Sequence, residues 1–185
     1  MFEPKKHIYL TVDEHCYLRI LTKKDVSEKY VLWLNDYEVT KYTEQRYRQY
    51  SRVDIEDFVV EKFKSKFDLL FGIFKDNRHI GNIKLGPINW KHMSGEVSYF
   101  IGEKDYWGKG IASSVVKKVV QFAFNEVGLK KVNAGYYENN LGSAKVLQKC
   151  SFVIEGVKRS ENVFEGKRIN SLIVGLTEND NNSGC

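Results

Sequence analysis

The chain has 185 residues and a mass of 21.5 kDa, and 42% of its residues are hydrophobic. This size and composition predict a single domain over residues 1–185 with a sizeable core. The formal charge of +5 suits an anionic partner such as a phosphorylated cofactor, but the 29 basic residues are interleaved with 24 acidic ones. Because no long basic block exists, we expect no nucleic-acid partner.

The cysteines and the N-terminal residues bear on location. Cys16, Cys150 and Cys185 are odd in number and lack metal-ligand spacing, which predicts reduced thiols, no metal, and a cytoplasmic protein. Residues 1–10 carry charges and Pro4 where a signal peptide needs an apolar segment, and no apolar run approaches the length of a membrane span. We therefore expect no membrane partner.

The first third of the chain predicts a strand, a helix and an irregular loop. Residues 16–21 alternate as a strand, and a helical apolar face that includes Trp33 follows capping residues and ends at Asn35. Residues 38–50 predict a short helix and then a surface loop. Its side chains Tyr42 and Arg46 either line a substrate pocket or pack over the sheet edge.

The next segment changes from helical to strand periodicity. A capped helix is expected from about residue 51 to residue 66, followed by a hairpin of strands 69–74 and 80–85. The second strand is disturbed at residues 86–87 and is expected to resume through residues 88–90. Residues 96–101 then predict the last strand of this meander.

A glycine-rich turn follows that strand and precedes an amphipathic helix over residues 111–124. Gly108 and Gly110 permit backbone conformations closed to other residues, and the first helical turn presents unpaired N–H groups. The turn is either an anion site or only a tight connection, since the Walker and dinucleotide-fold glycine spacings are both missing.

The remaining elements follow in close order. We expect a strand at residues 131–137, a helix at residues 141–149, and two strands near residues 152–162 and 169–176 joined by a turn at Glu165 and Gly166. The polar residues 178–185 are expected to be a disordered tail.

Two motifs resemble those of the GNAT superfamily of acetyl-CoA-dependent N-acetyltransferases. Residues 107–112 stand where the family has a Q/R-x-x-G-x-G/A pattern, with Gly110 and Ala112 at the small-residue positions and Trp107 in place of the glutamine or arginine. Residues 140–152 look like its NxxSxxxLxxxGF segment, some thirty residues further on. The resemblance covers about residues 16–177 and is most like the ribosomal-protein-alanine N-acetyltransferase group.

The resemblance implies an α+β fold with a mixed, mostly antiparallel sheet of about seven strands flanked by about four helices. Strands 96–101 and 131–137 are expected to splay apart around the pantetheine arm of acetyl-CoA, whose pyrophosphate would meet backbone N–H groups of residues 108–113. The expected cofactor-binding residues are Phe100, Ile101, Trp107, Gly108, Lys109, Gly110, Ile111, Ala112, Ser113, Asn140 and Ser143.

Acetyl transfer to an amine requires a base, an oxyanion donor and an acid for the leaving thiolate. Glu96 is the candidate base; alternatively, it is only an exposed acid at the end of a strand. A backbone N–H near Phe100 or Ile101 is the expected oxyanion donor. Gln148 stands where many members place a tyrosine acid. Ser143 is the expected substitute, with Tyr136 or Tyr99 as competitors, although a serine at this helix start can also bond only locally.

The implied reaction is direct transfer of acetyl to a primary amine. A protein N-terminus is the preferred acceptor, and a nucleotide-linked amino sugar or a polyamine is the alternative. Trp33, Tyr42, Arg46 and Tyr99 are the candidate acceptor-binding residues. A non-catalytic acyl-CoA sensor and a basic RNA-binding module are the rival classes. The expected assembly is a monomer or a homodimer.

Overall fold

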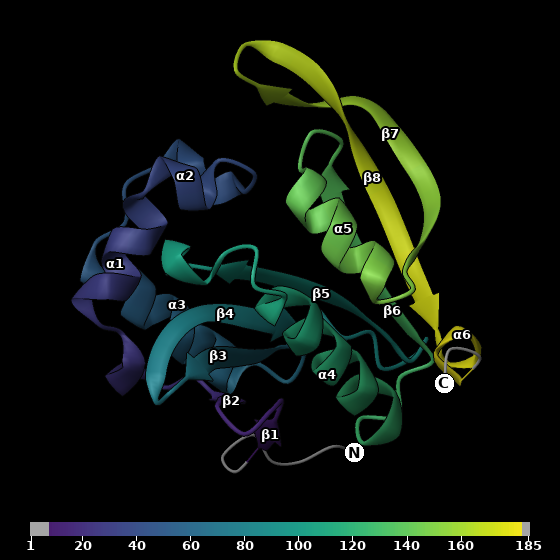
Figure 1. Ribbon diagram of the computed structural model, residues 1–185, viewed down its shortest axis with the longest axis horizontal. Helices are drawn as coiled ribbons and strands as arrows, with labels where there is room; N and C mark the ends of the chain where they lie inside the picture. The colour runs from purple at the N-terminus through teal and green to yellow at the C-terminus, as the bar shows by residue number, and fades with distance from the viewer. Residues whose placement is uncertain (1–7, 183–185) are drawn as a thin grey trace.

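The computed structural model describes residues 8–182, which form one mixed sheet with helices on both faces (Figure 1). The spatial order of its strands is β1-β2-β3-β4-β5-β6-β8-β7, and every neighbouring pair is antiparallel except β5 and β6. The strands are β1 (Tyr9–Thr11), β2 (Cys16–Ile20), β3 (Leu69–Lys75), β4 (Arg78–Leu85), β5 (Ser94–Ile101), β6 (Lys131–Tyr137), β7 (Val153–Phe164) and β8 (Lys167–Thr177).

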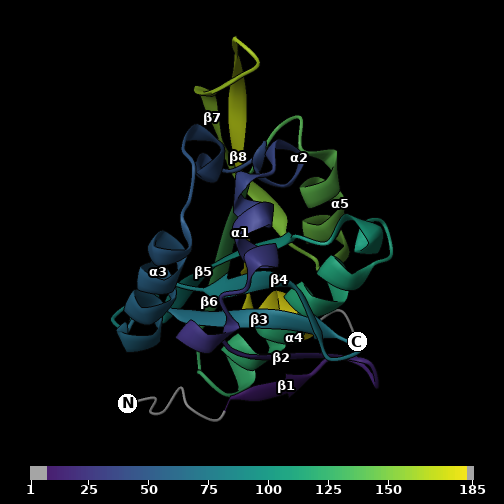
Figure 2. The same ribbon diagram turned by 90° about the vertical axis from the view of Figure 1, so that its left-hand side faces the viewer.

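The helices divide between the two faces, and each face has its own apolar cluster. Helix α4, with six buried valine and phenylalanine side chains, covers β4 to β6 together with α5, whereas α1 and α3 cover the opposite face (Figures 1 and 2). The helices are α1 (Glu28–Asn35), α2 (Tyr37–Thr40), α3 (Arg52–Lys64), α4 (Ile111–Asn125), α5 (Leu141–Lys149) and α6 (Glu178–Asn182).

Strands β5 and β6 are paired at one end only. The parallel register joins Ser94–Glu96 to Lys131–Asn133 and then stops, although β5 continues to Ile101 and β6 to Tyr137. The predicted splaying of these two strands is therefore confirmed. The remaining part of β5, residues 97–101, has no strand neighbour on its β6 side. This gap opens the middle of the sheet to ligands.

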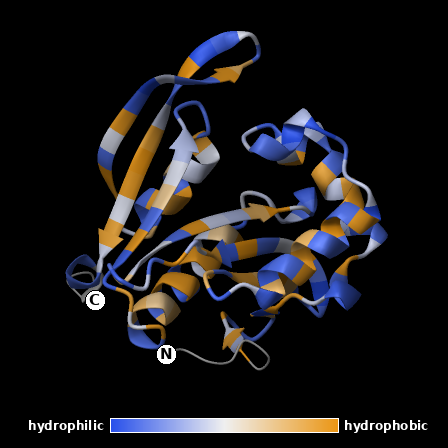
Figure 3. Ribbon diagram, turned by 180° about the vertical axis from the view of Figure 1, so that it is seen from behind, coloured by the Kyte–Doolittle hydropathy of each residue, from blue (hydrophilic) through white to orange (hydrophobic). Residues whose placement is uncertain are grey.

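The β7–β8 hairpin extends well beyond the body of the molecule (Figures 1 and 2). Its strands turn through Glu165 and Gly166, as predicted, with φ of 48° and 75°. Figure 3 shows that apolar residues run along the central strands and α4, whereas the outer part of the hairpin alternates polar and apolar residues. The hairpin stands beside the open half of the β5–β6 gap.

Three expectations about elements were wrong. The chain gains the short strand β1, whose Tyr9 ring stacks on Tyr17 at 4.9 Å, and residues 88–90 form no strand but a single bridge from Asn89 to Ser94. Residues 178–182 form α6 rather than a disordered tail, because Thr177 caps the helix: its hydroxyl oxygen accepts from the Asp180 N–H, and its own N–H donates to the Asp180 carboxylate. Residues 183–185 lie outside the described part of the chain.

Candidate active site

The glycine turn adopts the left-handed conformation that its sequence predicts. Gly108 and Gly110 have φ of 73° and 81°, and a Cβ added at either would meet no heavy atom within 4 Å. Gly110 is the N-cap of the 15-residue helix α4, so the unpaired N–H groups of the first turn open into this space. The turn thus has the free volume and the donors that a phosphate-bearing group requires.

A cleft of about 630 Å³ extends from this turn to the N-terminus of α5. Its walls come from both sides of the β5–β6 gap, which is why residues far apart in sequence meet there. All the residues predicted to hold the cofactor line the cleft except Lys109, whose ammonium group lies over the Tyr106 ring at 5.6 Å. These lining residues are Phe100, Ile101, Trp107, Gly108, Gly110, Ile111, Ala112, Ser113, Asn140 and Ser143.

Trp107 stands where the family pattern has glutamine or arginine, and its side chain has a hydrogen-bond partner. Its indole Nε1–H donates to the Ile101 carbonyl oxygen at 2.8 Å, so the glycine turn is tied to the end of β5. The Cys150 thiol similarly donates to the Ser113 carbonyl at 3.3 Å and ties the end of α5 to the start of α4. Both contacts hold the walls of the cleft in place.

Two hydroxyl groups meet at the centre of the cleft. The Tyr99 hydroxyl on β5 lies 3.1 Å from the Ser143 Oγ on α5, and the Ser143 N–H donates to the capping Asn140 Oδ1 at 3.0 Å. Burial raises the pKa of Tyr99 to about 12, so its phenol keeps its proton at neutral pH. The pair is a candidate proton donor.

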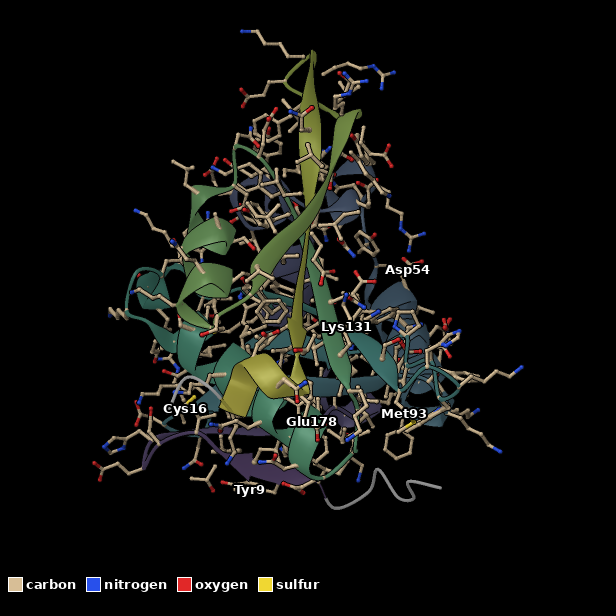
Figure 4. The ribbon with its side chains drawn as sticks, turned by 90° about the vertical axis from the view of Figure 1, so that its right-hand side faces the viewer. Tyr9, Cys16, Asp54, Met93, Lys131 and Glu178 are labelled. Carbon is tan, nitrogen blue, oxygen red and sulfur yellow. The ribbon has the colours of Figure 1, made fainter. Side chains whose placement is uncertain are left out.

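A second cavity of about 400 Å³ lies on the α1–α3 side of β5. Its floor includes Asn82 and Lys84 of β4, which pair in register with Phe100 and Ser98 of β5. Asp54 of α3, labelled in Figure 4, lies on its rim, on the α3 side of the molecule and away from α5. This cavity is the candidate acceptor site.

The two cavities share part of their walls. Tyr99 and Phe100 of β5, with Val39 and Thr43 of the segment after α1, line both. A nucleophile on one side and an acyl group on the other would therefore meet beside β5. Sequence analysis predicted Tyr99 and Phe100 in separate roles, whereas the structure places both at this shared wall.

The loop over residues 38–50 is fixed to the hairpin by Arg46. Its guanidinium donates to the Lys41 carbonyl at 2.7 Å within the loop and to the Val163 carbonyl at 3.0 Å on β7. The Tyr42 ring, which lines the cofactor cleft, stacks on Phe164 at 5.1 Å. Arg46 lines neither cavity, so its position is that of a latch between loop and hairpin.

Replacing Arg46 by alanine is expected to loosen this loop without unfolding the protein. Two backbone carbonyls lose a charged donor, and such bonds contribute about 1.5–3 kcal/mol each, less where solvent reaches them. Backbone amides of residues 41–48 should exchange with deuterium several-fold faster, and KM for the acceptor should rise. Arg52→Ala, which removes exposed ion pairs to Glu28 and Glu56, is the control; equal loop protection in both variants would contradict the latch.

The other predicted residues lie outside both cavities. Trp33 is 6% exposed and covers Gly102, where any Cβ would fall within 2.6 Å of the indole. Tyr136 packs against the main core. Glu96 is exposed on the same face of β5 as Ser98, at the last residue paired with β6.

Sequence analysis missed the floor of the second cavity. Asn82 is a buried polar residue inside the apolar strand β4, and this break in an otherwise apolar strand is the one signal that could have identified it. Lys84 gave no signal, because a lysine in a strand is ordinarily a solvent-facing residue. Its position in the site depends on pairing with β5.

Two further features of the described residues, 8–182, concern ligands and membranes. No group of three or more histidine, cysteine, aspartate or glutamate side chains is placed to hold a metal ion among them. None of the helices in this range has the length and apolar character needed to cross a bilayer.

Comparisons with known proteins agree with this geometry. A family model described as an acetyltransferase (GNAT) domain matches residues 15–153. A probable N-acetyltransferase of Bacillus subtilis, YjcK, is 36% identical over 109 residues, which span 57% of this chain and 60% of that protein.

Solved structures show the same fold over nearly the whole chain. A spermidine N-acetyltransferase from Vibrio cholerae superposes with a TM-score of 0.82 at 20% identity, covering 91% of this chain and 99% of its own. A ribosomal-protein-alanine acetyltransferase from Vibrio fischeri superposes with a TM-score of 0.79 at 22% identity, covering 94% and 98%. With three quarters of its residues matched by the family model, the chain belongs to the GNAT family of acetyltransferases, enzymes that use acetyl-CoA as cosubstrate.

Proposed function

We propose that this enzyme transfers the acetyl group of acetyl-CoA directly to a primary amine, and that the physiological acceptor is a protein N-terminus. The observation that carries the proposal is the shared wall at Tyr99 and Phe100, where a cleft ending in the glycine turn meets a second cavity. Direct transfer needs this arrangement, because both substrates must reach the same carbonyl carbon.

The residues present fit acetyl-CoA. Gly108 and Gly110 leave room for a group against the backbone, and the start of α4 supplies N–H donors for the pyrophosphate. Acetyl-CoA supplies the activated acyl group. The chain itself binds, orients the two substrates and moves protons.

Ile101 is the better candidate of the two predicted oxyanion donors. Its carbonyl is turned towards the glycine turn, where it accepts from Trp107, whereas the Phe100 carbonyl lies over Gly81 of β4. Since the N–H and C=O of one strand residue point to the same side, the Ile101 N–H opens into the β5–β6 gap. This donor is suited to a developing oxyanion.

The leaving thiolate and the acceptor ammonium require groups on opposite sides of β5. We assign the thiolate proton to the Tyr99–Ser143 pair, which lines the cofactor cleft. We assign the ammonium proton to Glu96, which shares the acceptor-side face with Ser98 and acts through water because it does not line the cavity. Tyr136, half-buried against the core, lines neither of the two cavities and stays a prediction.

The charges that line the acceptor cavity favour a protein N-terminus over a polyamine. The acceptor cavity has one acidic lining residue, Asp54, which is already bonded to Ser51 and lies 3.6 Å from Arg48. A polycation requires free carboxylates, whereas a peptide requires donors for its carbonyl groups. The free, buried Cys16 and Cys150 thiols agree with a cytoplasmic location.

The test is release of free thiol from acetyl-CoA with a panel of peptide, amino-sugar and polyamine acceptors. We expect turnover with peptides that begin with a small residue, identified by mass spectrometry as acetylation of the N-terminal amine. Turnover confined to polyamines or amino sugars would overturn the acceptor, and no thiol release with any amine would overturn the reaction.

Glu96→Gln tests the proposed base separately. We expect the variant to keep the full thermal shift with acetyl-CoA but to lose roughly 100-fold in kcat/KM near neutral pH, with partial recovery at a pH where the acceptor amine is already unprotonated. Glu126→Gln, an exposed change at the end of α4, is the control. Unchanged kcat/KM would remove Glu96 from the mechanism.

A further inference from the structure

The floor of the acceptor cavity contains a buried hydrogen-bond donor with no partner. The Asn82 side chain lines the cavity and is 3% exposed, yet its Nδ2 makes no hydrogen bond within the described residues. Leaving such a donor unpaired is unfavourable, because the group has lost water and gained no partner in exchange. A buried unpaired donor that faces a ligand cavity indicates a ligand atom as its partner.

The orientation of the Asn82 amide follows from its contact with His79. The His79 Nε2 lies 2.7 Å from the Asn82 Oδ1, and because an amide oxygen cannot donate, the proton of this bond is on Nε2. Burial lowers the pKa of His79, so the ring stays neutral and Nδ1 carries no proton. The amide oxygen is therefore engaged, and the NH₂ group is the part left for a ligand.

Aromatic rings hold His79 and leave it no alternative position. Its imidazole stacks on Phe74 at 5.1 Å and meets the Trp33 and Tyr30 rings edge-on at 5.1 and 5.7 Å. Burial raises the pKa of the Tyr30 phenol, and the neighbouring Asn82 amide opposes part of that rise. The Asn82 Nδ2 itself meets no partner at hydrogen-bond geometry. The donor is thus preorganised by a rigid, neutral cluster.

The charges around Asn82 fit an oxygen-bearing ligand better than a second ammonium group. Arg48 lines the same cavity as a cation, and so does Lys84, whose ammonium group lies 3.6 Å from the Asp68 carboxylate. Its one carboxylate, Asp54, accepts from the Ser51 N–H at 2.8 Å and lies 3.6 Å from Arg48. The side chains that face the ligand space therefore offer donors rather than a free acceptor.

We propose that the Asn82 Nδ2 donates a hydrogen bond to a carbonyl or carboxylate oxygen of the acceptor and thereby selects amines with such an oxygen close to the amino group. This specificity rests on the proposed function, because it requires the second cavity to hold the acceptor. It places peptides and amino-acid amides among the substrates and excludes simple alkylamines and diamines from efficient turnover.

The test compares three amines of nearly equal shape. Alaninamide carries the carbonyl, sec-butylamine replaces its amide group by an ethyl end, and 1,2-diaminopropane replaces it by a second ammonium. Steady-state kcat/KM is measured with acetyl-CoA at equal concentrations of unprotonated amine. The wild type is expected to favour alaninamide at least tenfold over both others, the effect of about one hydrogen bond in a buried site.

Two variants of Asn82 separate the donor from the shape of the site. Asn82→Leu keeps the volume and removes the donor, so alaninamide should lose about tenfold while sec-butylamine is unchanged. Asn82→Asp should instead shift the preference towards 1,2-diaminopropane. Asn125→Leu, at an exposed position on α4, is the matched control, and thermal melting with acetyl-CoA checks folding and cofactor binding.

The outcomes distinguish failure of the proposed Asn82 role from failure of the proposed acetyltransferase reaction. If the wild type acetylates all three amines equally, prefers the diamine, or keeps its preference in Asn82→Leu, the inference is overturned while the acetyltransferase reaction stands. If none of the amines or peptides is acetylated by protein that binds acetyl-CoA, the proposed function itself fails. A loss of preference in either folded variant supports the inference.

Discussion

Gly110→Val is expected to abolish the stabilisation of the protein by acetyl-CoA. A ligand that binds only the folded state adds roughly 2.7 kcal/mol at a hundred times its dissociation constant. Gly110 has φ of 81°, and its Cβ position is empty space at the N-terminus of α4. A valine there strains the turn and fills the volume in which a phosphate would approach the N–H groups. The measurement is thermal melting with and without acetyl-CoA.

A second glycine of the chain provides the control for backbone strain. Gly166, in the β7–β8 turn, has φ of 75° and equally open space at its Cβ position. Gly166→Val should therefore lower the melting temperature by a similar amount, since both variants force a β-branched residue into the left-handed region. Only Gly110→Val should lose the shift with acetyl-CoA. A full shift in that variant would mean that the glycine turn is merely a tight connection.

The glycine turn and the elements around it could be predicted because their signals are local. Positive φ at Gly108 and Gly110 follows from residue type, and helices α4 and α5 follow from apolar spacing and from the capping Asn140. The short elements were harder. Strand β1 has three residues, and it forms because β2 offers a free edge, which its own sequence does not reveal.

The second cavity, the candidate acceptor site, could not be predicted because it depends on the register between strands. Asn82 faces the cavity only because it pairs with Phe100, and a shift of one residue would turn it to the opposite face. The Tyr99–Ser143 contact likewise joins residues 44 positions apart, across the gap between β5 and β6. Trp33 illustrates the reverse case: it was predicted to bind the acceptor, but its ring covers Gly102 instead.

Tyr99→Phe is expected to lower kcat by about 100-fold or more while leaving the acetyl-CoA thermal shift unchanged, because a positioned general acid contributes about 10²–10⁴ in rate. Ser143→Ala should have an effect of the same kind, and the double variant should be little worse than either single one, since the two hydroxyls act as one donor at 3.1 Å. Tyr136→Phe, on a ring that packs against the core, is the matched control. A loss in Tyr136→Phe with none in Tyr99→Phe would move the acid to Tyr136.

The pH profile offers an independent check of this assignment. Burial raises the pKa of Tyr99 from its ordinary value of 10.0 to about 12, so the phenol remains protonated throughout the range in which the acceptor amine loses its proton. Wild-type kcat should therefore rise with pH and reach a plateau, with no descending limb below pH 10, because proton donation is lost only as the pH rises through the raised pKa. A descending limb near neutral pH would require an acid of much lower pKa than the Tyr99 phenol, and would assign the thiolate proton to another group.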